Sequence, residues 1–305
     1  MIRLGWFILM SVLSLISFAA FGEEQVRIRA PQGPGDAAFA YYKDLLQTVL
    51  QNTTEDYGEA HVVVTDLNVS QARSLLLVRD SNYLDVEWAG TNREREEMLR
   101  AIRVPLNMGL LGERLLVIKK SRHDEFDKIT GAQQLKTLIA CQGQHWPDSD
   151  ILEQNQFTVE RIIVFELMWD MLTWDRCDYF PRAVIEGYVE VNKYGSDRFD
   201  TYDRILISYP FPMFFFISKK KEQMAQRIES GLLKMLQDGS LLSFMEHHEA
   251  TQSAFPLSRY KNSLRIKIDN PFLSDDTRRL MKSLQLPDRL FNGSLPAHQA
   301  QGSTN

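Results

Sequence analysis

Side chains that could carry out chemistry are spread along the chain, and none of them completes a known catalytic motif. The sequence has no GxSxG nucleophile turn, no HExxH zinc helix and no phosphate-binding P-loop. His247 and His248 stand beside Glu249, but adjacent side chains point to opposite sides of a helix or strand, which disfavours a shared metal ion. We therefore expect no enzymatic activity, no metal and no cofactor.

Two glycine-containing turns are candidates for binding an anion through backbone N–H groups. Residues 33–36 precede the first expected helix, and residues 143–148 occupy a second strand-to-helix position farther along the chain. The N-terminus of a helix attracts anions because its first N–H groups have no partner within the helix. Ordinary loop chemistry explains the first turn equally well. In the second turn, which begins at Gly143, the ring of Trp146 could stack on a ligand or pack against its own domain.

Composition and the first segment indicate an exported globular protein. Of the 305 residues, 44% are hydrophobic and 25% are charged, with a formal net charge of −5. This acidity argues against a nucleic-acid binder, which normally carries a basic excess on one face. Residues 1–22 have a positive start at Arg3, an apolar run and small residues at the end, as in a cleavable secretory signal peptide. An uncleaved membrane anchor is the alternative, and cleavage predicts a soluble periplasmic protein.

The two cysteines, Cys141 and Cys177, are too few for a scaffold built on disulfides. An exported compartment would permit a bond between them. Both are expected on neighbouring strands of a parallel sheet, where side-chain geometry is often unsuited to bridging. Two buried thiols are therefore the favoured interpretation.

Strands and helices alternate along the chain, which predicts an α/β fold with mainly parallel sheets and helices on both faces. Apolar and β-branched runs predict the strands, and apolar residues at helical spacing predict the helices. The expected strands lie at 26–30, 61–65, 84–87, 115–118, 138–141, 177–180, 205–208 and 214–218, and the longer helices near 39–50, 93–103, 159–173 and 222–237.

The order of several short motifs resembles the extracellular solute-binding protein family of the type II periplasmic binding fold, in its polar amino-acid group. The resemblance covers about residues 25 to 250. The motifs that carry it are residues 84–88 followed by 91–96, the apolar crossing at 109–118, the turn at 143–149, the strand motif at 176–182 and the closing helix at 231–240.

This resemblance implies two α/β lobes joined by two crossings, with a ligand in the cleft between them. The first lobe would comprise residues 23–110 and 211–286, and the second residues 111–210. Residues 287–305 would form a C-terminal tail. Closure around the ligand would be a hinge motion of the two packed lobes.

The resemblance also implies that Arg95 clamps a ligand carboxylate, because a guanidinium fork suits bidentate binding of an anion. Many members have the spacing T-x-x-R, whereas Thr91 and Arg95 are one residue further apart, so Arg93 remains an alternative. A solvated charge on a helix explains Arg95 without any ligand. Thr91 would donate its hydroxyl to the same carboxylate or cap the helix, and Trp88 is a further candidate contact.

In the second lobe, Asp178 matches the acid of the family's strand motif and is a candidate contact. Members commonly hold the ligand amine with an acid about five residues further along. This chain has Ala183 at that position, with Arg182 beside it. Arg182 and Arg95 together would favour an anionic ligand, although Arg182 could instead form a surface or interlobe salt bridge. Glu186 and Glu190 are candidates for the missing amine partner.

The sequence thus predicts a monomeric periplasmic protein that captures a small polar or anionic, amino-acid-like solute and delivers it to a membrane transporter. The alternative is a ligand sensor that signals to a membrane kinase or cyclase. Both roles need the same cleft and the same lobe closure, so the sequence does not separate them.

Overall fold

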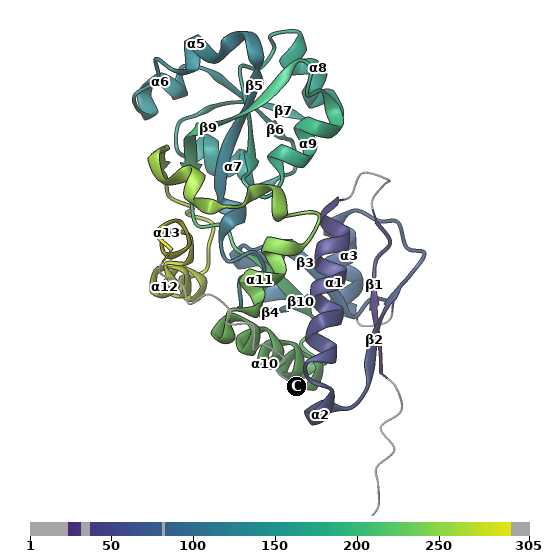
Figure 1. Ribbon diagram of the computed structural model, residues 1–305. Coiled ribbons are helices and arrows are strands. Elements are labelled where there is room, and N and C mark those ends of the chain that lie inside the picture. Colours follow the sequence, from purple (N-terminus) through teal and green to yellow (C-terminus); the bar gives the residue numbers. More distant parts are fainter. Residues whose placement is uncertain (1–23, 32–36, 81–82, 294–305) are drawn as a thin grey trace, which may run out of the picture.

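The computed structural model describes residues 24–31, 37–80 and 83–293 (Figure 1). The expected signal peptide and the glycine turn at residues 33–36 lie outside the described residues. None of the described helices combines the length and the hydropathy that a bilayer span requires.

The first lobe is the lower body in Figure 1. Strands β1 and β2 pair in parallel, and β10 runs antiparallel between β3 and β4. The N–H of Asp85 donates to the carbonyl of Arg27 over 2.8 Å, which places β1 beside β3. The strands are β1 (Glu24–Ile28), β2 (Ala60–Val64), β3 (Val86–Gly90), β4 (Arg100–Ile102) and β10 (Met213–Ile217), and the helices are α1 (Ala37–Gln51), α2 (Thr54–Tyr57), α3 (Gln71–Asp80), α4 (Arg93–Met98), α10 (Glu222–Asp238) and α11 (Ser240–His247).

Helix α1 shows how the sequence pattern builds this lobe. Its buried residues include Tyr42, Leu45, Leu46, Val49 and Leu50, which fall at positions i, i+3, i+4, i+7 and i+8. Such spacing places them on one face of a helix, and that face joins the core cluster that contains the strands β1 and β3.

The second lobe, the upper body in Figure 1, repeats this arrangement. Strands β6 and β7 pair in parallel, and a four-stranded sheet has the order β11-β9-β5-β8. A parallel bridge between Ala140 and Tyr179 places β6 beside the start of β8. The strands are β5 (Glu113–Lys119), β6 (Ile139–Gly143), β7 (Thr158–Ile162), β8 (Phe180–Ala183), β9 (Phe199–Ser208) and β11 (Leu264–Lys267), and the helices are α5 (His123–Phe126), α6 (Ala132–Lys136), α7 (Pro147–Gln154), α8 (Leu167–Thr173) and α9 (Gly187–Tyr194).

The α/β fold with two lobes agrees with the prediction, but the strand pairing is mixed rather than mainly parallel. Strand β5 pairs antiparallel with both β8 and β9, and β10 pairs antiparallel with β3 and β4. The chain enters β5 and β10 directly from the other lobe. Each of these two strands is therefore antiparallel to its neighbours in the sheet, which the chain reaches from within the same lobe.

Two segments cross between the lobes side by side. The first ends in the short helix η1 (Leu110–Gly112), and the second comprises residues 209–212. The N–H of Tyr209 donates to the carbonyl of Gly112 over 3.0 Å. A Cβ atom on Gly112 would lie 1.9 Å from the carbonyl oxygen of Tyr209. Only glycine allows the two crossings to approach this closely.

Three predicted boundaries are wrong. The helix predicted at 159–173 is strand β7 followed by the shorter α8, because the β-branched residues at its start pair with β6. The tail predicted at 287–305 begins later, since α13 (Leu286–Phe291) is helical and buries Leu290 and Phe291. Residues 264–267, assigned to the first lobe, form β11 and pair with β9 in the second lobe.

The two cysteines form a disulfide, so the interpretation as buried thiols is wrong. Their Cα atoms are 5.4 Å apart, which is within the reach of a bridge. Cys141 lies on β6, but Cys177 precedes β8 instead of lying on a strand. The geometry of two paired parallel strands, which would oppose a bond, therefore does not apply.

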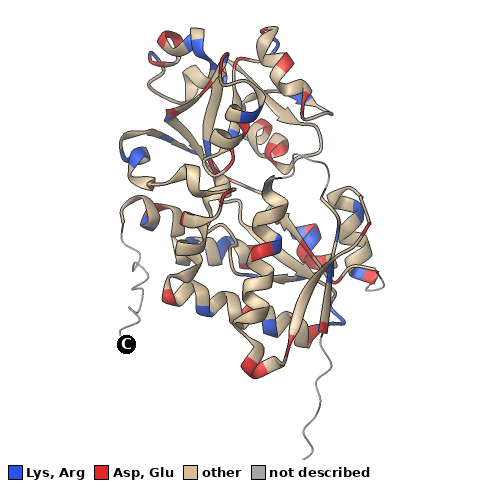
Figure 2. Cartoon of the chain, turned by 45° about the vertical axis from the view of Figure 1, so that its right-hand side comes forward, with Lys and Arg blue, Asp and Glu red and all other residues tan. Residues whose placement is uncertain are grey.

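Acidic and basic residues are distributed over both lobes along the described elements (Figure 2). Many of them form ion pairs. The buried carboxylate of Asp85, for example, accepts hydrogen bonds from the side chains of Arg27 and Lys221.

Candidate functional site

A cavity of about 440 Å³ lies between the lobes beside the two crossings. Its volume falls in the range of small-molecule binding sites. Both lobes and the crossings line it: Ser70, Gln71, Ala72, Gly90, Arg95 and Met213 from the first lobe, Leu111, Arg114 and Phe211 from the crossings and their ends, and His145, Trp146, Pro147, Asp148, Arg182 and Glu186 from the second lobe.

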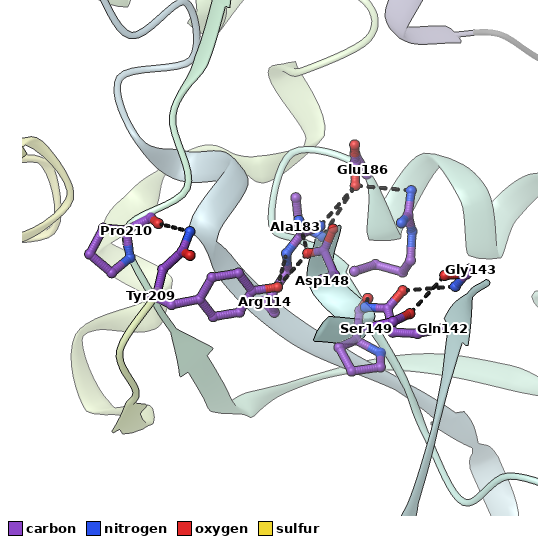
Figure 3. A network of polar contacts seen from close by, with 12 residues as sticks. Arg114, Gln142, Gly143, Asp148, Ser149, Ala183, Glu186, Tyr209 and Pro210 are labelled. Carbon is purple, nitrogen blue, oxygen red and sulfur yellow. Dashed lines mark hydrogen bonds and ion pairs between the residues drawn. The ribbon is translucent and has the colours of Figure 1, made fainter. Parts of the chain in front are cut away.

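Arg114, the second residue of β5, lines this cavity, and Figure 3 shows the polar contacts around it. Its guanidinium donates to Asp148 over 2.5 Å, to the hydroxyl of Tyr209 over 3.0 Å and to Glu186 over 3.4 Å. The Tyr209 hydroxyl also donates to Asp148. Burial by itself would lower the pKa of Arg114, but Asp148 and its other partners raise that pKa. Arg114 therefore links both crossings to helix α7 of the second lobe.

Arg182 lies at the end of β8, between aromatic rings and carboxylates. Its guanidinium carbon is 5.0 Å from the ring centres of both Trp146 and Phe180. Glu190 accepts two hydrogen bonds from it at 2.6 Å, and Glu186 is 2.9 Å away. Burial alone would lower the pKa of Arg182, but the two carboxylates raise it. The positive charge of Arg182 is thus matched within its own lobe by a buried ion pair, whereas the salt-bridge alternative placed such a pair at the surface or between the lobes.

Arg95 differs from these two arginines because no acidic partner holds it. It lies on α4, which Asn92 caps, and its guanidinium donates to the carbonyl of Gly90 over 2.5 Å. Within the described part of the chain no carboxylate lies within 4.0 Å of this guanidinium. Burial lowers the pKa of Arg95, although Glu87 and Glu94 act in the opposite direction. A guanidinium remains charged under such conditions, so Arg95 presents an unpaired positive charge to the cavity.

Thr91 lies close to this arginine but uses its hydroxyl for another contact. The hydroxyl donates to Glu96 over 2.7 Å, and the residue is 1% exposed. The capping role belongs to Asn92, whose side chain accepts the N–H of Arg95. Thr91 lines a second, smaller cavity of about 160 Å³, which shares Arg95 with the larger one.

The structure places the other predicted contacts as follows. Trp88 is buried between Tyr42 and Phe39 and does not line the cavity. Asp178 binds Arg122 and the N–H of Ile139, at the opposite end of β8 from the cavity. These two predictions place the residues wrongly with respect to the cavity.

The turn at residues 143–148 does reach the cavity, through its last four residues and not through Gly143. A Cβ atom on Gly143 would lie 2.4 Å from the indole ring of Trp146. Glycine therefore lets this ring fold back over the turn, with one edge at the cavity.

Two charged residues of the site, Arg114 and Asp148, have no separate signal in the sequence, whereas Glu186 is already a candidate for the amine partner. The only local indication for Arg114 is a charged pair, with Glu113, that interrupts an apolar run. Asp148 follows Pro147 at the start of α7, where an acidic residue is ordinary for a helix N-terminus. Each of these residues is explained locally, so only their contacts in space identify them.

Comparison with solved structures finds the same fold in two-lobed binding proteins. The Bacillus subtilis protein ytmK, described as a probable amino-acid ABC transporter extracellular-binding protein, has a TM-score of 0.56 at 11% identity, covering 75% of this chain and 99% of its own. The BvgS VFT2 domain of Bordetella pertussis, in a double-mutant form, has a TM-score of 0.54 at 13% identity, covering 74% and 93%. An ancestral arginine-binding protein bound to arginine has a TM-score of 0.52 at 14% identity, covering 75% and 98%.

No protein-family model and no curated protein sequence matches the chain. The solved structures are matched over nearly their whole length, and both lobes with the interlobe cavity are present here. The chain therefore has the two-lobed α/β fold of type II periplasmic binding proteins.

Proposed function

We propose that the chain is a binding protein, not an enzyme, that captures a small amino-acid-like solute in the interlobe cavity. The observation that carries this proposal is the guanidinium of Arg95, which faces the cavity without an acidic partner among the described residues. A ligand carboxylate would complete its hydrogen bonds and neutralise its charge. The fold supports the proposal, since its solved examples include an arginine-binding protein.

The second lobe offers the opposite charge to the same ligand. Glu186 lines the cavity with a side chain that is 23% exposed, and its Oε2 atom faces Arg114, Arg182 and the N–H of Ala183. No donor in the described part of the chain reaches its Oε1 atom. A ligand ammonium group could bind there, which assigns to Glu186 the amine-binding role that Ala183 cannot fill. A ligand with both groups would bridge the lobes and favour the closed form.

The finer parts of the proposal concern compartment and partner. We propose a periplasmic monomer that delivers its solute to a membrane transporter, with residues 1–22 as the cleaved signal peptide. The transporter-associated ytmK supports this role. Signalling to a membrane protein is the second candidate, and the BvgS domain with the same fold supports it.

Saturating ligand is expected to raise the melting temperature of the mature protein by roughly 5–10 °C. A ligand at 100 times its dissociation constant adds about 2.7 kcal/mol of stability, and a chain of this size gains roughly 2–4 °C for each kcal/mol. The measurement is a thermal-shift screen against amino acids, dicarboxylates and polyamines. A response to dicarboxylates alone would remove the ammonium site at Glu186, and no response in any class would contradict the proposal.

Replacing Arg95 by alanine is expected to weaken binding of the best amino acid in that screen by roughly tenfold to a hundredfold, since charge-assisted hydrogen bonds contribute about 1.5–3 kcal/mol. Lysine should restore little, because one ammonium group does not reproduce the guanidinium fork. Calorimetric titration measures each affinity after circular dichroism has confirmed the fold.

Arg93 provides the matched control, because it lies on the same helix and its side chain is exposed. Arg93→Ala should change the affinity by less than about 1 kcal/mol. If Arg93→Ala abolishes binding and Arg95→Ala does not, the clamp is Arg93. Should neither variant bind more weakly, the carboxylate clamp is wrong.

A further inference from the structure

The C-terminal segment, residues 263–291, is attached to the second lobe through residues 264–268. Strand β11 pairs in parallel with β9, from Leu264 opposite Ile205 to Lys267 opposite Ser208. The N–H of Ile268 then donates to the carbonyl of Ser208 over 2.9 Å. We refer to residues 263–291 as the C-terminal strap.

One buried carboxylate joins this strap to both interlobe crossings. Glu113, at the end of the first crossing, has a side chain that is 3% exposed. Its Oε1 atom accepts the hydroxyl of Ser208, which precedes the second crossing, over 2.7 Å. The same oxygen accepts the guanidinium of Arg265, on the strap, over 2.8 Å. Farther along, the amide of Asn270 donates to the carbonyl of Pro210 over 2.9 Å. The strap therefore runs beside the two crossings where the lobes meet.

The strap then attaches to the first lobe through a second buried carboxylate. Glu96, on α4, is 3% exposed in its side chain. Its two oxygens accept the hydroxyl of Ser274 over 2.8 Å and the hydroxyl of Thr277 over 2.7 Å. Ser274 caps α12 (Asp275–Leu284), which carries Thr277. The carbonyl of Phe272 also accepts the N–H of Arg93 over 3.1 Å. The start of the strap is thus fixed to the second lobe and its middle to the first lobe, while α13 folds back on the start, where Asp288 pairs with Arg265.

The strap also closes one side of the site. The smaller cavity of about 160 Å³ is lined by residues of both lobes and by Asn270 and Phe272 of the strap. Arg95, His145 and Pro147 line this cavity and the larger one. Any motion that separates the lobes near Arg95 must therefore stretch or detach the strap.

We propose that the C-terminal strap is a third hinge strand that limits how far the two lobes separate. Two crossings alone permit a rotation about the axis that joins them, as in hinge closure of two-lobed proteins. The chain then passes from α11 in the first lobe to β11 in the second through residues 248–263, and the strap returns from β11 to the first lobe. This return lies at a different position from the two crossings and is hydrogen-bonded to each lobe, so it resists that rotation and narrows the range of open forms. The strap restrains the lobes in the ligand-free protein, so this inference is independent of the ligand and of the proposed function.

The test measures the distance between spin labels on the two lobes in the full chain without ligand. Arg73 on α3 and Glu166 before α8 are both exposed and replaceable by cysteine for labelling, and the native cysteines are already bonded to each other. The variant Ser274→Asp with Thr277→Val detaches the strap from Glu96. Aspartate keeps the helix cap but repels the carboxylate, and valine removes the second hydroxyl without changing the shape.

In this double variant, the distribution of distances between the two spin labels is expected to broaden. Its mean is expected to increase by more than the width of the distribution in the parent protein. Ser283→Ala is the matched control, since this exposed hydroxyl donates only to the carbonyl of Leu280 on the same helix; it should leave the distribution unchanged. If circular dichroism shows that the double variant does not fold, Thr277→Val alone serves as the milder test, and a partial broadening is then expected. A folded detached variant with the parent distribution would overturn the proposal.

Discussion

Replacing Asp148 by alanine is expected to destabilise the protein by about 3–5 kcal/mol, because the change removes the nearest carboxylate from a buried guanidinium. The side chains of Arg114 and Asp148 are 2% and 7% exposed. Once Asp148 is gone, Glu186 remains near Arg114 at 3.4 Å, and the Tyr209 hydroxyl loses its acceptor. The loss should therefore lie near the lower end of this range. Urea unfolding of the parent protein and of Asp148→Ala measures this loss, provided that the two proteins have the same m-value.

The double variant Arg114→Met with Asp148→Leu shows whether the unpaired charge causes the loss. Removing both partners of a buried ion pair is often neutral or stabilising, whereas removing one leaves an uncompensated charge. The double variant should therefore unfold at a higher urea concentration than Asp148→Ala. The Tyr209 hydroxyl loses its acceptor in both proteins, and in the double variant it also loses the hydrogen bond from Arg114, which makes the expected difference smaller. A double variant that is no more stable than the single one would contradict the buried-charge explanation.

The fold could be predicted from the sequence because its determinants are local and periodic. The apolar stripe of α1 and the continuous β-branched run of β2 identify a helix and a strand without any knowledge of their neighbours. The order of such elements then predicts two α/β lobes. The direction of β5 and β10 in their sheets could not be obtained in this way, because it depends on how the chain crosses between the lobes.

The candidate site was predictable only in part, since it depends on contacts between distant segments. Arg95 was identified through the motif that surrounds it, and the structure places it at the cavity. Arg114 and Asp148 are 34 positions apart and come together only in the folded lobe, where the side chain of Arg114 reaches the start of α7. Trp88 was misplaced for a related reason: on a strand whose residues are all buried, nothing in the sequence separates a face toward the core from one toward a cleft.

The sequence pattern does not reveal the disulfide, because it predicts both cysteines on paired strands. Cys177 instead lies in the segment between α8 and β8, where the backbone is free to bring its side chain toward β6. The N–H of Cys141 donates to the carbonyl of Tyr179 over 2.8 Å, so the two segments are already adjacent. The disulfide therefore joins β6 to the segment before β8. Trp146 follows β6 in the chain, and Arg182 lies on β8.

Removing this bond with Cys141→Ala and Cys177→Ala is expected to lower the free energy of unfolding by about 4 kcal/mol, the chain-entropy value for a loop closed over 36 residues. Because the bond holds together the two segments that carry Trp146 and Arg182, its loss should also make the second-lobe wall of the cavity less rigid. Guanidinium unfolding of the oxidised protein, the reduced protein and the double variant measures the effect. Reduction should bring the parent protein to the midpoint of the double variant and should leave the double variant unchanged. If the unfolding midpoint of the untreated protein does not respond to reductant, and two thiols can be alkylated after unfolding, the interpretation as buried thiols is restored. The order of the second-lobe wall would then depend on packing and on the ion pairs of Arg182 alone.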